Sequence, residues 1–129
     1  MAKAIYKILI VEDEKMFQEL LVDRLSKDGL FQIYTADNGQ EGLDAAFNAK
    51  PDLILLDILM PVMSGIKMMK EMKKYEQLKD IPIIFLTGVD PDEDIMTEIA
   101  EAKPSFYLIK SKTNLEDIAQ KIKETLGIK

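Results

Sequence analysis

The chain has 129 residues and a formal net charge of −6 at pH 7, with 47% hydrophobic and 31% charged residues. These values are typical of one globular domain, and the negative charge argues against direct nucleic-acid binding. The absence of cysteine and histidine excludes disulfides, thiolate or imidazole metal ligands and histidine-based catalysis. No apolar run approaches the roughly 20 residues of a membrane span, and no signal peptide is evident, so we expect a cytoplasmic protein without membrane insertion.

Five short runs rich in apolar and β-branched residues predict β-strands. Several of these runs are continuously apolar, as in strands that are covered on both faces of a sheet. In chain order, the predicted strands are Lys7–Val11, Phe31–Ala36, Leu53–Leu56, Pro82–Leu86 and Phe106–Ile109.

A segment with helical periodicity follows each predicted strand. Gly29 predicts the end of the first helix and Gly127 the end of the last, while Thr113 and Glu116 have the spacing of a capping box at the start of the last helix. The apolar positions that define the five helices are Phe17, Leu20, Leu21 and Leu25; Leu43, Ala46 and Phe47; Ile66, Met69 and Met72; Ile95, Ile99 and Ala102; and Leu115, Ile118, Ala119, Ile122 and Leu126.

Strands and helices alternate through short connections, without a linker, a repeat or a low-complexity segment. We therefore predict a single domain over residues 1–129 with an α/β fold, a (βα)5 doubly wound parallel five-stranded sheet with helices on both faces. The flavodoxin-like strand order 2-1-3-4-5 would place the first and third strands side by side and the second strand at an edge.

The residues that follow the strands carry the polar chemistry, and ligands bind at this edge of open α/β sheets. Glu12 and Asp13 follow the first strand, and Asp57 follows the third. Thr87 follows the fourth strand and Lys110 the fifth, so the predicted strand order gathers all five side chains. Carboxylates at close range repel one another unless a cation lies among them, and an all-oxygen site suits Mg²⁺, Mn²⁺ or Ca²⁺.

The cationic and hydroxyl groups beside these acids point to phosphoryl chemistry. The ammonium of Lys110 suits a phosphoryl oxygen, and Thr87 can donate a hydrogen bond to another. In these surroundings Asp57 can act as a nucleophile toward a phosphoryl group and form an acyl phosphate.

Four segments in this order resemble the receiver domain of bacterial two-component response regulators, in particular the stand-alone type of the chemotaxis response regulator. They cover essentially the whole chain, and each lies on the expected element. The segments are ILIVEDE (Ile8–Glu14), LILLDILMPVMSG (Leu53–Gly65), PIIFLTG (Pro82–Gly88) and YLIK (Tyr107–Lys110).

The resemblance implies the phosphorylation and metal sites. Asp57 would be the phosphoacceptor that becomes 4-aspartyl phosphate. Asp13 and Asp57 would bind Mg²⁺ directly, with Mn²⁺ as an alternative ion. The backbone carbonyl of Leu59 would be a further ligand, and Glu12 would act through a bound water.

The resemblance also implies a switch in a phosphorelay. Lys110 and Thr87 would contact the phosphoryl oxygens, and Tyr107 matches an aromatic position coupled to phosphorylation. The donor would be a phosphohistidine on a sensor histidine kinase or a histidine phosphotransfer protein. A downstream target would bind the surface of the fourth helix, fifth strand and fifth helix. The domain would not be an enzyme beyond self-catalysed phosphotransfer and slow autodephosphorylation.

The sequence departs from the family pattern at several places, one of which is Gly88 where alanine is more usual. Ser111 follows Lys110 where the family has proline, so the cis peptide common there is not expected. Lys103-Pro104 replaces the usual Gly-Ala and predicts an altered exit from the fourth helix. Leu59 and Val89 are apolar at positions that influence acyl-phosphate hydrolysis, which predicts slow self-dephosphorylation.

Three other functions are weighed against this one. A receiver-like scaffold that works without phosphate stays open because of Ser111. An aspartyl-phosphate phosphatase similar to the haloacid dehalogenases needs a second aspartate two residues after the nucleophile, where this chain has Leu59. A flavodoxin-like FMN carrier needs a Ser, Thr and Gly-rich loop after the first strand, where EDEKM is acidic.

Overall fold

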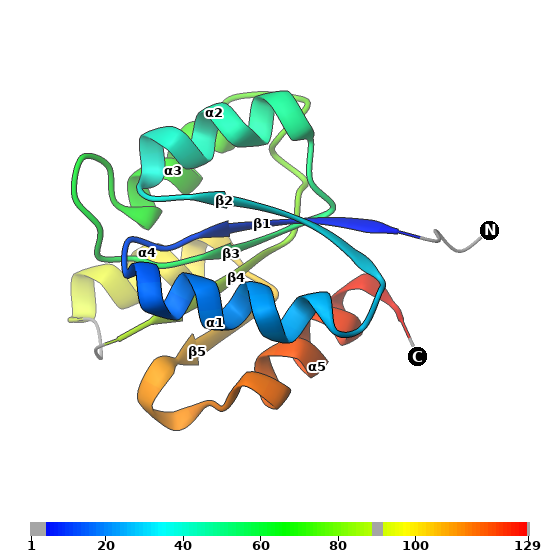
Figure 1. Ribbon diagram of the computed structural model, residues 1–129. Helices are drawn as coiled ribbons and strands as arrows, with labels where there is room; N and C mark the ends of the chain where they lie inside the picture. The colour runs from blue at the N-terminus through cyan, green and yellow to red at the C-terminus, as the bar shows by residue number, and fades with distance from the viewer. Residues whose placement is uncertain (1–4, 89–91, 129) are drawn as a thin grey trace.

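The structure, a computed structural model, describes residues 5–88 and 92–128; residues 1–4, 89–91 and 129 lie outside the described part. Five parallel strands form one sheet in the order β2-β1-β3-β4-β5, which confirms the predicted fold class (Figure 1). The strands are β1 (Tyr6–Val11), β2 (Phe31–Ala36), β3 (Leu53–Leu56), β4 (Ile83–Thr87) and β5 (Phe106–Ile109). The helices are α1 (Lys15–Ser26), α2 (Gly39–Ala49), α3 (Gly65–Met72), α4 (Glu93–Ala102) and α5 (Leu115–Leu126), with a 3-10 turn η1 (Lys110–Lys112) after β5.

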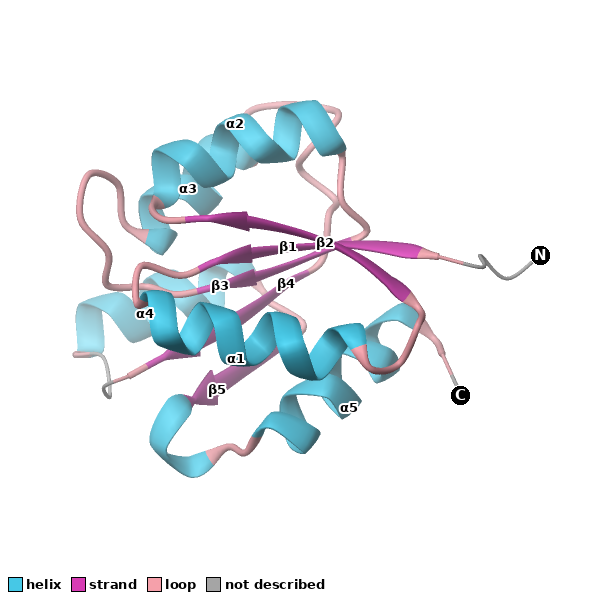
Figure 2. Cartoon of the chain, in the orientation of Figure 1, coloured by secondary structure: helices cyan, strands magenta, loops and turns pink. Residues whose placement is uncertain are grey.

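Helices cover both faces of the sheet, so the central strands are buried on both sides (Figure 2). One core lies under α1 and α5 and contains Leu21 and Ile118, and the other lies under α2, α3 and α4 and contains Leu43 and Ile99. This two-sided burial explains why the strand sequences are continuously apolar rather than alternating. The arrowheads in Figure 2 all point the same way, so the carboxyl ends of the strands share one edge.

Side-chain caps start four of the helices, and one of them differs from the prediction. Asn38, Ser64 and Asp92 accept hydrogen bonds from the first turns of α2, α3 and α4. At α5 the cap is Asn114, whose side chain accepts from the backbone N–H of Asp117, so the capping box predicted from Thr113 is wrong. Asparagine is among the strongest N-cap residues, and it outcompetes the neighbouring threonine here.

The predicted first helix is corrected at two positions. It ends at Ser26, and Gly29 lies beyond it in the turn to β2 with a positive φ of 67°. Leu20 is 47% exposed rather than in the core. The buried residues of α1 are Gln18, Leu21 and Leu25, and this stripe leaves Leu20 on the flank of the helix.

The loop after α4 and the peptide bond after Lys110 are two places where the sequence departs from the family pattern. Lys103 ends α4 in the left-handed region with a φ of 53°, directly before Pro104, which gives this helix its altered exit. No peptide bond in the described part of the chain is cis, so Lys110–Ser111 is trans, as expected. None of the described helices has the length and hydrophobicity of a membrane span.

Candidate functional site

Backbone hydrogen bonds fix the first residues beyond β1 and β3. The backbone N–H of Asp57 donates to the carbonyl of Val11 at 3.0 Å, and that of Glu12 donates to the carbonyl of Ala36 at 3.0 Å. The parallel ladder therefore continues past the strand ends and holds Glu12 and Asp57 beside each other. Both residues are buried, with 2% and 6% of their surface exposed.

A glycine lets the chain after Asp57 fold back closely against it. A Cβ at Gly65 would lie 2.0 Å from the backbone carbonyl oxygen of Asp57, so only glycine fits there. The N–H of Gly65 donates to the carbonyl of Ile58 at 2.9 Å, and Ser64 caps α3 at the same point. The loop from Asp57 to Gly65 is thus closed at its base.

Three carboxylates meet at this edge of the sheet. Glu12, Asp13 and Asp57 each offer an oxygen atom, and these atoms all lie within 4.8 Å of one another. Carboxylate oxygens are the ligands that Mg²⁺ and similar hard cations prefer. The sequence-based prediction that these acids converge is therefore correct, and their donor atoms fit a divalent cation.

Lys110 is the cation of the cluster. Its Nζ lies 2.7 Å from Oε1 of Glu12, 3.4 Å from Oδ2 of Asp57 and 3.0 Å from Oε1 of Glu14. The ammonium also lies 4.8 Å from the centre of the Phe17 ring, which is a cation–π distance. One lysine is therefore shared among several acids.

The charge balance of the cluster is unfavourable for an ionised Asp57. Burial and then the charge of Glu12 raise the pKa of Asp57 to about 7, although Lys110 and the N–H of Ile58 act in the opposite direction. Burial alone would lower the pKa of Lys110, but its hydrogen bonds to Glu12 and Glu14 outweigh that effect and raise it. The cluster therefore lacks positive charge, and a divalent cation would supply it.

Gln18 of α1 braces the acidic loop, and sequence reasoning missed it. Its Nε2 lies 3.0 Å from the backbone oxygen of Glu12, 3.3 Å from that of Ala36 and 3.1 Å from Oδ1 of Asp37. The side chain is only 4% exposed. A polar residue at the centre of an apolar helix stripe is the signal that could have found it.

A small pocket of about 200 Å³ opens over the cluster. Its lining residues are Asp13, Glu14, Asp57, Leu59, Gly88 and Lys110. Leu59 lines the pocket and is 54% exposed, and its role as a third metal ligand through the backbone carbonyl stays a prediction. Val89, the other position predicted to influence hydrolysis, lies outside the described residues.

The two remaining predicted residues, Thr87 and Tyr107, are not among those that line the pocket. Thr87 is the last residue of β4, is 1% exposed, and precedes the lining residue Gly88. Tyr107 lies on β5 opposite Phe85, is half-buried, and packs against the core under α2, α3 and α4. The structure thus gathers Glu12, Asp13, Asp57 and Lys110 at one point, with Leu59 at the rim and Thr87 on the adjacent strand end.

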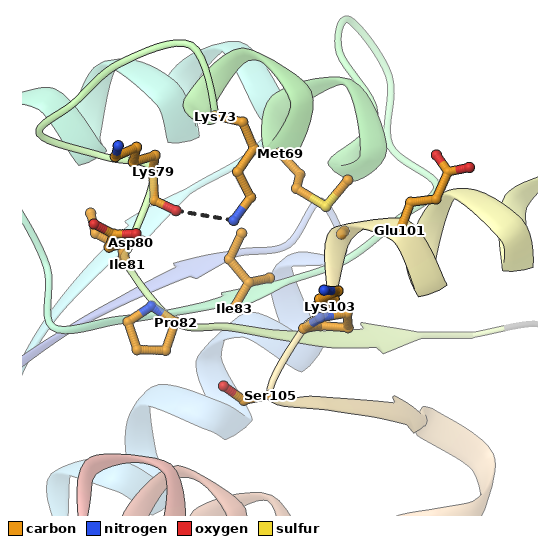
Figure 3. Close-up of a pocket in the computed structure, with 12 residues that line it drawn as sticks. Met69, Lys73, Lys79, Asp80, Ile81, Pro82, Ile83, Glu101, Lys103 and Ser105 are labelled. Carbon is orange, nitrogen blue, oxygen red and sulfur yellow. Dashed lines mark hydrogen bonds between the residues drawn. The ribbon is translucent and has the colours of Figure 1, made fainter.

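A larger hollow of about 520 Å³ lies at the opposite edge of the sheet, between the end of α3, the start of β4 and the end of α4 (Figure 3). Lys73 reaches across it, and its Nζ donates to the backbone oxygen of Lys79 at 3.0 Å. Asp80 and Glu101 contribute charges of opposite sign to the lysines. This mixed lining lacks the convergence of like charges that marks the smaller pocket.

Comparison with known proteins agrees with the geometry. The sequence model of the response regulator receiver domain family matches residues 8–123, although the prediction that one domain fills residues 1–129 stays a prediction. The solved structure of the chemotaxis protein CheY4 from Vibrio cholerae is 28% identical, with a TM-score of 0.83 over 94% of this chain and 98% of that chain.

Two curated relatives are longer proteins. The chain is 36% identical over 89 residues to a probable transcriptional regulator, ycf29, of Pyropia yezoensis, and this match covers 69% of the chain and 40% of the relative. It is 34% identical over 104 residues to the sensor histidine kinase TmoS of Ectopseudomonas mendocina, which covers 81% of the chain but 10% of the relative. The family match and these relatives show that the chain belongs to the receiver domains of two-component signalling.

Proposed function

We propose that the chain is a phosphorylation-activated switch in which Asp57 accepts a phosphoryl group. The observation that carries this proposal is the convergence of the buried Glu12 and Asp57 with the exposed Asp13, where the ammonium of Lys110 contacts both buried acids. Like charges this close are costly unless a ligand balances them. A divalent cation and a phosphoryl group are ligands whose charges match the acids and the lysine.

The chemical step is a transfer to the carboxylate of Asp57. An Oδ atom of Asp57 forms a bond to phosphorus while the P–N bond of a phosphohistidine breaks. The imidazole nitrogen leaves with the electron pair of that bond and takes up a proton from water. The transferred group arrives with its three oxygens and is carried as an acyl phosphate on the aspartate side chain.

The residues around Asp57 provide charge and position. A Mg²⁺ ion held by Asp13, Asp57 and the backbone carbonyl of Leu59, with Glu12 acting through water, would supply the positive charge that keeps Asp57 ionised and offsets charge on the phosphoryl oxygens. Lys110 contacts Asp57 at 3.4 Å and would bind a phosphoryl oxygen of the transferred group. Burial excludes water from most of the aspartate and strengthens these interactions.

The partners follow from the proposal and from the relatives. The phosphoryl donor would be a sensor histidine kinase or a histidine phosphotransfer protein, in a cytoplasmic phosphorelay of the bacterial type. Thr87 would bind a second phosphoryl oxygen, and Tyr107 on β5 would respond to it. The surface of α4, β5 and α5 would then bind a downstream target. Catalysis by this chain would be limited to its own phosphotransfer and a slow hydrolysis.

Incubation with acetyl phosphate and Mg²⁺, followed by intact mass measurement, tests the proposal. The wild type should gain one phosphoryl group, and the gain should disappear with a chelator. Asp57→Asn should gain none, whereas Asp28→Asn, a matched change at a partly buried acid outside the pocket, should react like the wild type. A wild type that gains no mass with Mg²⁺ and donor would contradict phosphorylation and favour a scaffold that works without phosphate.

A further inference from the structure

Glu14 is a fourth acid at the pocket, and the family resemblance gives it no role. It lines the pocket together with Asp13 and Lys110, and its side chain is 66% exposed, whereas that of Glu12 is 3% exposed. Glu14 is the N-cap residue of α1, yet its side chain makes no capping hydrogen bond. Its carboxylate instead accepts a hydrogen bond from Nζ of Lys110 at 3.0 Å.

The ammonium group of Lys110 has as many carboxylate partners as it has N–H donors. An ammonium group has three N–H donors. In the described part of the chain, Nζ of Lys110 lies within 3.4 Å of carboxylate oxygens from Glu12, Glu14 and Asp57. A phosphoryl oxygen that binds Lys110 must therefore displace one of these three contacts.

Glu14 is the contact that is easiest to displace. Glu12 is buried and holds the shortest contact, 2.7 Å, and its other oxygen accepts from the backbone N–H of Glu14 at 3.0 Å. Asp57 is the residue that would receive the phosphoryl group. Glu14 can swing into solvent without leaving a buried charge unpaired, because two thirds of its side chain is already exposed.

The cation next to Glu14 in sequence does not neutralise it. Nζ of Lys15 lies 3.0 Å from Oδ1 of Asp37 and 3.4 Å from Oε1 of Gln18. Lys110, the cation that does contact Glu14, is shared with Glu12 and Asp57, so the mouth of the pocket at Glu14 carries a net negative charge that repels an incoming phosphoryl donor.

We propose that Glu14 is a specificity residue that selects against small anionic phosphoryl donors, by competing for Lys110 and by repelling the incoming charge. This inference rests on the proposed phosphorylation of Asp57. A protein donor brings binding energy from its own surface, which can offset the displacement of Glu14. A small donor such as acetyl phosphate has almost no such surface. Nothing therefore offsets the free-energy cost of displacing Glu14 and of approaching its negative charge.

Phosphorylation rates from two small donors of different charge test this role. The donors are acetyl phosphate and phosphoramidate, which carries less negative charge at neutral pH. We expect Glu14→Gln to raise the rate with acetyl phosphate roughly two- to five-fold, the scale of an exposed ion pair. The gain should be smaller with phosphoramidate and should shrink as salt is added. Glu14→Asp, which keeps the charge but shortens the reach toward Lys110, should give a smaller gain than Glu14→Gln.

Glu19→Gln provides the matched control, because Glu19 is an exposed acid of α1 outside the pocket lining and its loss changes the net charge equally. Equal rates for wild type, Glu14→Gln and Glu19→Gln would overturn the role of Glu14 while leaving phosphorylation of Asp57 intact. A slower Glu14→Gln would overturn it as well. A wild type that accepts no phosphoryl group from either donor would instead overturn both proposals.

Discussion

Two groups of charged side chains in this molecule are built differently. Between α1 and α5, Asp28 lies 3.1 Å from Nη1 of Arg24 and 3.2 Å from Nζ of Lys123, and Glu116 accepts from Nη2 of Arg24 at 2.9 Å. Burial works against ionised Asp28, but hydrogen bonds from Lys123 and Arg24 outweigh it and lower the pKa of this carboxyl. At the carboxyl edge of the sheet, the pKa of Asp57 is instead raised to about 7.

The difference lies in the ratio of acids to cations. The first group has two acids, Asp28 and Glu116, and two cations, Arg24 and Lys123, whereas Asp57 shares the ammonium of Lys110 with Glu12 and Glu14. In the first group the positive and negative charges are balanced within the folded chain, and the ion pairs link the end of α1 to α5. The second is left short of positive charge, and it can be completed by a ligand that brings charge of its own.

The largest expected effect is the removal of the unbalanced acid. In metal-free protein, Asp57→Asn should raise the free energy of unfolding at pH 8 by on the order of 2 kcal/mol, after allowance for screening by water at the open pocket. The folded-state pKa of about 7 exceeds the ordinary 3.8, so the folded wild type keeps a proton that the unfolded chain loses. Wild-type stability from this group is therefore full below pH 4 and is lost as the pH rises to about 7.

Urea unfolding of both proteins between pH 4 and pH 8, with a chelator present, measures this difference. The stability gap should widen in favour of Asp57→Asn as the pH increases. A gap that stays constant, or that widens in favour of the wild type, would show that Asp57 is not strained by its neighbours.

The next largest effect is stabilisation by Mg²⁺. A cation that binds the folded acids should raise the free energy of unfolding by about 1.4 kcal/mol at ten times its dissociation constant. Thermal unfolding with and without MgCl₂ should show this gain in the wild type and in Asp28→Asn. Asp13→Asn should lose most of it, and an equal gain in Asp13→Asn would place the ion elsewhere.

The balanced group should respond in the opposite direction. Asp28→Asn should lower the free energy of unfolding by about 1 kcal/mol at pH 7, because two ion pairs are lost at a partly buried site. The pKa of Asp28 is lowered, so its contribution is present above pH 4 and is lost as the pH falls through its folded-state pKa. Denaturant titrations at pH 7 and pH 3 check this sign, and a variant as stable as the wild type at pH 7 would refute it.

The smallest expected effect concerns the rim of the pocket. Leu59 is exposed and apolar, so it cannot orient a water molecule toward an acyl phosphate. Leu59→Asn should shorten the phosphoryl half-life roughly two- to ten-fold, the scale of one hydrogen bond in the transition state. Intact mass after removal of the donor measures the decay. Leu59→Met, which stays apolar, should keep the wild-type half-life, and equal lifetimes for all three proteins would refute the idea.

The convergence of the acids could be predicted because it depends on topology. Glu12, Asp57 and Lys110 directly follow strands, and the order β2-β1-β3-β4-β5 places those strand ends along one edge. The positions of the strands could be read from apolar runs that are buried on both faces. These are properties of the backbone, and periodicity in the sequence reports them well.

Features that depend on side-chain direction could not be predicted in this way. The contact of Glu14 with Lys110 joins residues 96 positions apart and requires a specific rotamer on each. The brace formed by Gln18 depends on carbonyl groups that carry no sequence signal. Thr113 and Asn114 are both favourable N-cap residues, and they are neighbours in the sequence. The sequence pattern alone could not tell which of them caps α5, and in the structure it is Asn114.

Mapping of the phosphorylated residue tests the central claim most directly. The protein would be treated with acetyl phosphate and Mg²⁺, reduced with borohydride, which converts an aspartyl phosphate to homoserine, and then digested for peptide mass analysis. We predict homoserine at position 57 and unmodified acids at Glu12, Asp13 and Glu14. Homoserine at another aspartate, or none in a wild type that has gained a phosphoryl group, would contradict the assignment of Asp57 as the acceptor.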